Sequence, residues 1–126
     1  MAYRILLDSQ QSLEELYQKT QNPIYQEGEW IQCKNISDFT KVIVANQIEA
    51  KTMPELISYE FGFGFDIVDK TVNPRAETGI DAIQWLIKFC IERRVALPDW
   101  LIHTEDPTQK YNMNTILRNS KEVYKL

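Results

Sequence analysis

The chain switches repeatedly between short apolar runs and longer segments in which apolar residues recur at helical spacing. Four short runs are rich in aliphatic and aromatic residues and are bounded by turn-forming residues, which is typical of buried β-strands. They lie at residues 3–7, 30–33, 55–61 and 99–104. We therefore expect four strands, the first of which ends at Asp8.

Four longer segments predict helices, at residues 9–20, 35–50, 77–95 and 109–126. In the first of them, Ser12 and Glu15 have the Ser-x-x-Glu spacing of a capping box. In the second, Ser37 or Asp38 is expected to cap the helix, although many β-branched residues lower the helix propensity of this segment.

The third segment has the widest apolar face, which extends to Ile91, and the pair Arg93–Arg94 closes it where cations favour the helix dipole. The last segment is expected to bury Tyr111, Ile116 and Val123.

Strands and helices therefore alternate four times along the chain. Such alternation favours a parallel sheet with helices on both faces and right-handed crossovers. We expect a single α/β domain over residues 1–126, with a three-layer receiver- or flavodoxin-like fold and strand order 2-1-3-4.

Composition and charge narrow the class of protein. The 126 residues include 44% hydrophobic and 25% charged residues, as in ordinary soluble domains, and no apolar run approaches the ~20 residues of a membrane span. The first strand begins almost at once, so we expect a cytoplasmic protein. We expect Cys33 and Cys90 to be reduced cysteines that lie in the core. A net charge of −4 argues against a broad nucleic-acid surface.

Polar residues follow three of the expected strands. Asp8 and Ser9 come after the first strand, Glu60 lies at the end of the third, and His103 and Thr104 end the fourth. In open parallel sheets ligands bind at the carboxyl ends of the strands. A site built from these residues is therefore expected at that edge of the sheet.

Four segments together resemble a known family, the cyclic-phosphate-processing receiver-like domains. They are "YRILLDSQ", "ISYEFGFG", "GIDAIQWL" and "LPDWLIHTEDP", the last followed by "YNM". The resemblance implies metal-assisted chemistry on a cyclic phosphate. It places a Mg²⁺ or Mn²⁺ site at Asp8 and Glu60, an acid or base at His103, a phosphate-binding hydroxyl at Thr104, and a substrate contact at Asn112.

Each of these residues also has a structural interpretation. His103 could be a buried ring bonded to a backbone carbonyl, and Asp8 could cap the first helix. Glu60 could be a simple exposed strand-end carboxylate. Asn112 could be a cap or a backbone tie at the start of the last helix.

An aromatic stretch, "YEFGFGF", opens a long irregular segment after the third strand. Phe61 and Phe63 could stack on a ligand base, dock a protein partner, or fold back on the core. Lys70 and Arg75 lie in the same segment and could meet a phosphate or sit in solvent.

The chain departs from the family pattern at three positions. Ser9 stands where the family has a second aspartate, and Phe61 and Gly62 replace a histidine and another aspartate. We therefore favour a degenerate domain that binds a nucleotide, a cyclic phosphate or a protein partner without turnover. The alternative is a metal-dependent phosphodiesterase-like enzyme. A compact domain with an eroded site would also suit a viral accessory protein acting in the host cytoplasm.

Overall fold

The computed structural model describes residues 2–62 and 77–126. Within them strands and helices alternate as the sequence predicts. The elements are β1 (Arg4–Leu7), α1 (Leu13–Thr20), the short 3₁₀ helix η1 (Pro23–Gln26), β2 (Trp30–Cys33), α2 (Ile36–Ala50), β3 (Leu56–Tyr59), α4 (Gly79–Arg93), β4 (Asp99–Ile102) and α5 (Pro107–Tyr124).

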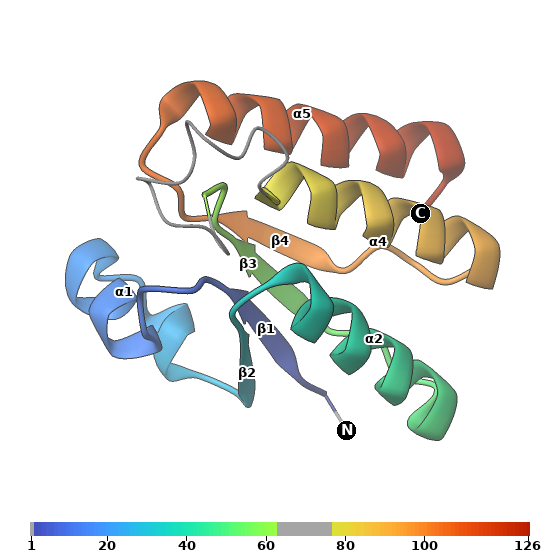
Figure 1. The fold of residues 1–126 in the computed structure, drawn as a ribbon, viewed down its shortest axis with the longest axis horizontal. Helices are drawn as coiled ribbons and strands as arrows, with labels where there is room; N and C mark the ends of the chain where they lie inside the picture. Colours follow the sequence, from blue (N-terminus) through green and yellow to red (C-terminus); the bar gives the residue numbers. More distant parts are fainter. Residues whose placement is uncertain (1, 63–76) are drawn as a thin grey trace.

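The four strands form one parallel sheet in the order β2-β1-β3-β4, which confirms the expected topology. Helices α2, α4 and α5 cover one face of the sheet, and α1 lies on the other (Figure 1). The result is a three-layer α/β domain with a flavodoxin-like fold. Within residues 2–62 and 77–126, no helix is both long and apolar enough to cross a membrane.

The two faces of the sheet are built from alternate residues of each strand, because successive side chains in a strand point to opposite sides. In β1, Ile5 and Leu7 belong to the larger core under α2, α4 and α5. Leu6 points the other way and packs with Leu16 of α1 and Tyr25 of η1 in a smaller cluster. The sheet is therefore buried on both sides near β1.

Helix caps agree with the sequence for α1 and differ for α2. The Ser12–Glu15 capping box is present at α1. The N-cap of helix α2, however, is Asn35 and not the expected Ser37 or Asp38, which lie inside the first turn. The Asn35 side chain accepts a hydrogen bond from the Asp38 amide at 2.8 Å. Asparagine forms this bond as well as serine or aspartate does, which explains the shift.

The buried face of α5 differs from the expected one. Tyr111 and Val123 are 71% and 70% exposed, and the fully buried residues are Met113 and Leu117. These two lie four positions apart and therefore on one side of the helix, and Ile116 packs partly beside them. The tyrosine was misleading because an aromatic ring with a polar hydroxyl is also stable at a wet surface.

Helix α4 and the cysteines behave largely as expected. The helix ends at Arg93 and Arg94 caps it with a left-handed backbone, but Ile91 is exposed rather than part of the buried face. Cys33 and Cys90 are free and buried. Burial raises the pKa of each thiol to about 12, so both stay protonated at neutral pH.

Candidate functional site

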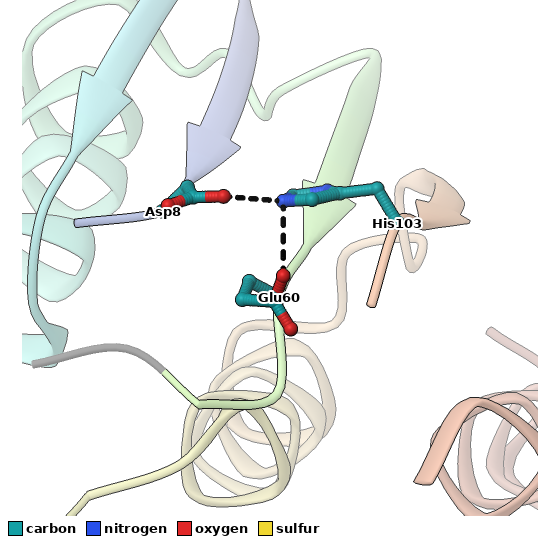
Figure 2. Close-up of side chains that lie close together, drawn as sticks. All are labelled: Asp8, Glu60 and His103. Carbon is teal, nitrogen blue, oxygen red and sulfur yellow. Dashed lines mark hydrogen bonds and ion pairs between the residues drawn. The ribbon is translucent and has the colours of Figure 1, made fainter. Parts of the chain in front are cut away.

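Asp8, Glu60 and His103 meet at the carboxyl edge of the sheet (Figure 2). Each directly follows its strand, and the last strand residues Leu7, Tyr59 and Ile102 are paired across β1, β3 and β4. The next side chains therefore point to the same side in one row. One ligand atom from each lies within 4.8 Å of the others.

The Asp8 carboxylate is held by three hydrogen bonds. Its Oδ1 accepts from the amides of Gln10 and Gln11 at 2.7 and 2.9 Å. Its Oδ2 lies 2.9 Å from Nε2 of His103. The side chain of Gln32 in β2 stabilises the loop between β1 and α1 by donating hydrogen bonds to the backbone oxygens of Asp8 and Gln11. Asp8 thus orders the loop before α1, but the helix cap is Ser12.

Burial and hydrogen bonding act in opposite directions on Asp8. Burial alone would raise the pKa of its carboxyl. The hydrogen bonds from His103 and from the amides of Gln11 and Gln10 outweigh burial and hold the pKa below its ordinary value of 3.8. Asp8 is therefore an anion at neutral pH, although only 3% of its side chain is exposed.

His103 is the centre of a buried hydrogen-bond network. Its side chain is 1% exposed, and its Nδ1 lies 2.7 Å from Oγ of Ser58. That oxygen lies 2.8 Å from the hydroxyl of Tyr25. The ring is therefore buried, as the structural interpretation supposed, but among residues 2–62 and 77–126 its hydrogen-bond partners are side chains and not a backbone carbonyl. We call the four side chains joined by these contacts the buried network; they are Tyr25, Ser58, His103 and Asp8.

Glu60 differs from a simple exposed carboxylate. Its Oε1 accepts a hydrogen bond from the amide of Phe61 at 2.7 Å. Its Oε2 lies 3.9 Å from Nε2 of His103, and 20% of the side chain is exposed. Glu60 therefore connects the buried network to solvent.

An open pocket of about 230 Å³ lies at this edge of the sheet. The described residues that line it are Asp8, Gln10, Gln11, Lys19, Glu60, Gly62, Thr104, Glu105 and Asp106. Four of them are carboxylates and one is a lysine, and Lys19 forms an ion pair with Glu105. The pocket therefore carries an excess of negative charge, which attracts a cation and repels an isolated phosphate.

Not every residue expected at the site lies there. Thr104 lines the pocket. Phe61 packs instead against the core, as one of the sequence interpretations supposed. Asn112 is exposed on α5, and the helix cap is Asp106, not Asn112. Phe63 lies outside the described residues, as do Lys70 and Arg75.

Two members of the buried network were missed from the sequence, Ser58 and Tyr25. The signal for Ser58 was a serine within the otherwise aliphatic and aromatic strand "LISY", because a buried polar side chain needs a hydrogen-bond partner. Ser58 also lies two positions before Glu60 and so on the same side of the strand. Tyr25 gave no such signal, since the turn-rich segment around it predicted no buried residue.

The donor set of Asp8, Glu60 and His103 fits a divalent cation. Carboxylate oxygens suit Mg²⁺ and Mn²⁺, which also retain water ligands. An imidazole nitrogen is a better ligand for the later transition metals, so the mixed set is more compatible with Mn²⁺ than with Mg²⁺. Nε2 of His103 can join only if it carries no hydrogen.

No protein-family model, curated protein or solved structure matches this chain. The function is therefore inferred from the geometry and chemistry of the site.

Proposed function

We propose that this domain binds a divalent cation at Asp8 and Glu60 and, through the cation, a small phosphate-containing ligand such as a nucleotide or cyclic phosphate, without turnover. The observation that carries this proposal is the buried, charged Asp8 beside Glu60 and His103 in an acidic pocket.

The charge of the pocket supports a cation as the first ligand. Asp8 stays ionised in a nearly dry environment, where an opposite charge is attracted more strongly than in water. Glu60 supplies a second carboxylate that reaches solvent, so an arriving ion has an entry path. Mn²⁺ or Mg²⁺ bound here would supply the positive charge that a phosphate needs.

The pocket also contains groups that suit the second ligand. Thr104 offers a hydroxyl beside the carboxylates, and Lys19 offers an ammonium group at the rim. Lys19 is already paired with Glu105, so its charge alone does not make an anion site. Phosphate binding is therefore expected to depend on the cation. The family resemblance adds the expectation that the phosphate is cyclic.

The position of His103 supports binding rather than turnover. A general acid or base must come within hydrogen-bond reach of the proton that it transfers. The His103 side chain is almost completely buried, and both ring nitrogens already have protein partners. The ring can orient Asp8 and complete the cation site, but it offers no free nitrogen to a substrate.

Calorimetric titration tests the proposal. Mn²⁺ should bind the wild-type protein, and a 2′,3′-cyclic nucleotide should bind only when Mn²⁺ is present. Glu60→Gln keeps the size of the side chain and should weaken Mn²⁺ binding at least tenfold. Glu122→Gln, on the exposed side of α5, is the matched control and should bind normally.

Absence of Mn²⁺ binding to the wild-type protein would overturn the proposal, and so would two further results. The first is nucleotide binding of equal strength with and without Mn²⁺. The second is opening of the cyclic phosphate by the wild-type protein that is lost in His103→Ala, which would establish the enzyme alternative.

A further inference from the structure

Two buried hydroxyls stand behind His103 on the side away from the pocket carboxylates. Ser58 is completely buried and Tyr25 almost so. The distances along the buried network are 2.8 Å from Tyr25 to Ser58, 2.7 Å from Ser58 to Nδ1 of His103, and 2.9 Å from Nε2 to Asp8. These distances are ordinary for hydrogen bonds, so each contact holds one hydrogen, and its donor follows from what the two groups can donate or accept.

For an imidazole that carries one hydrogen, and without a cation, one arrangement of hydrogens satisfies the contacts of the network. The ionised Asp8 carboxylate can only accept, so Nε2 of a neutral His103 carries the ring hydrogen. Nδ1 then accepts from the Ser58 hydroxyl, and the Ser58 oxygen accepts from Tyr25. In this state Nε2 has no lone pair for a metal.

We propose that the Ser58–Tyr25 hydroxyl pair allows Nε2 of His103 to change from a hydrogen-bond donor into a metal ligand, because the pair can accept a hydrogen bond from Nδ1 as well as donate one to it. This inference rests on the cation site proposed above. When a cation binds Nε2, that nitrogen loses its proton to solvent and Nδ1 gains a proton, so the ring still carries one hydrogen and stays neutral. Nδ1 then donates to Ser58.

A hydroxyl pair suits this exchange because each hydroxyl can both donate and accept. Ser58 turns its hydrogen from Nδ1 toward the Tyr25 oxygen, and no heavy atom has to move. A second pocket, of about 310 Å³, is also lined by Tyr25 and His103. Water in this pocket can accept the hydrogen bond that the Tyr25 hydroxyl donates once it no longer donates to Ser58. A backbone carbonyl in place of Ser58 would accept only and would hold a single tautomer.

The role proposed for Ser58 and Tyr25 is that of positioning residues, since neither lines the acidic pocket. Partners that orient a metal-binding histidine are typically worth about 10- to 100-fold in metal affinity. Removing either hydroxyl is therefore expected to weaken cation binding without changing a ligand of the cation.

Nitrogen-15 NMR of the imidazole tests the inference directly, because His103 is the single histidine of the chain and its signals need no assignment. Without metal, the wild-type ring should be the Nε2–H tautomer. Zn²⁺ is a diamagnetic probe that accepts carboxylate and imidazole ligands. On adding it, the ring should become the Nδ1–H tautomer with Nε2 bound to the metal.

Two variants each remove one hydroxyl of the Ser58–Tyr25 pair, and a third variant is the control. Ser58→Ala should keep the Nε2–H tautomer in the metal-free protein, because Asp8 still accepts from Nε2, but should weaken Zn²⁺ binding about tenfold or more, because Nδ1–H of the bound ring loses its acceptor. Tyr25→Phe should keep the metal-free tautomer but weaken Zn²⁺ binding about tenfold or more, because Ser58 loses its acceptor in the bound state. Tyr17→Phe, in the same small cluster, is the matched control and should change neither signal nor affinity.

The outcomes distinguish this inference from the proposed function. Unchanged Zn²⁺ affinity in Ser58→Ala would overturn the role of the hydroxyls and leave the cation site standing. Unchanged Zn²⁺ affinity in Tyr25→Phe would do the same. Absence of Zn²⁺ and Mn²⁺ binding to the wild type would overturn both the cation site and the exchange, even with the expected metal-free spectra.

Discussion

Replacing Asp8 with asparagine keeps the shape of a buried side chain and removes its charge. The asparagine oxygen can still accept from the amides of Gln10 and Gln11. Its amide nitrogen, however, faces Nε2 of His103, so two donors oppose each other unless the ring changes tautomer. The variant therefore loses one hydrogen bond to a charged group and retains the two that order the loop.

The magnitude follows from the bond that is lost. A hydrogen bond to a charged group contributes about 1.5–3 kcal/mol, so Asp8→Asn should lower the free energy of unfolding by about 2 kcal/mol at pH 7. For a domain of 126 residues, 1 kcal/mol corresponds to about 4 °C in Tm, and the expected loss is about 8 °C. Asp8→Ala removes all three acceptor contacts and should cost about 3–5 kcal/mol.

The difference in stability between wild type and Asp8→Asn should decrease as the pH falls. The pKa of Asp8 is lower in the folded protein than its ordinary value of 3.8, so the folded state binds this proton less readily than the unfolded state. The stabilisation by the charge is thus complete above about pH 5 and is lost as the pH falls through the folded pKa. The difference in stability between wild type and Asp8→Asn should therefore begin to shrink below about pH 4 and disappear only below the folded pKa.

Urea unfolding followed by circular dichroism at pH 7, 5 and 3.5, with a chelator present, measures this difference. Asp99→Asn at an exposed position of β4 is the control, with an expected change within about 0.5 kcal/mol. A difference between wild type and Asp8→Asn below 0.5 kcal/mol, or one that is equal at all three pH values, would refute the reasoning.

Three further changes test the packing around the site. Asn35→Ala should lower stability by about 1 kcal/mol in thermal unfolding because it removes the α2 cap, whereas an equal loss in Ser37→Ala would contradict that assignment. Leu117→Ala should cost about 2–5 kcal/mol and Val123→Ala less than 0.5, and the reverse order would mean a different buried face of α5. Gly79→Ala should cost more than about 2 kcal/mol by urea unfolding, because its Cβ would overlap a backbone carbonyl after β3 and a methionine of α5; a neutral change would show that this contact relaxes.

The fold was largely predictable because it depends on the spacing of apolar residues. Strands and helices of such different periodicity can be recognised in one sequence, and the crossover rule limits their order in the sheet. The row of Asp8, Glu60 and His103 followed in turn from the rule that parallel strands end at one edge.

The finer features depend on competition between neighbours, which periodicity does not resolve. Asn35, Ser37 and Asp38 are all good caps, and local spacing does not say that Asn35 is the one that caps α2. His103 contacts Ser58 of β3 and Asp8 after β1, and Ser58 in turn contacts Tyr25 of η1, a segment with no regular pattern. Such contacts between distant segments leave no trace in local spacing.

The buried network also has a consequence for the folding pathway. Asp8 and His103 are separated by 95 positions, and Ser58 lies between them on the strand that joins β1 to β4. Closing contacts at such separation is entropically costly, so the network can form only late, once three strands have docked. A shift of β3 by one residue would turn Ser58 to the opposite face and place Tyr59 beneath α1. The buried network can therefore form only in a chain whose strands pair in the native register. In a chain with another register, the charged Asp8 carboxylate would lack its hydrogen bond from His103.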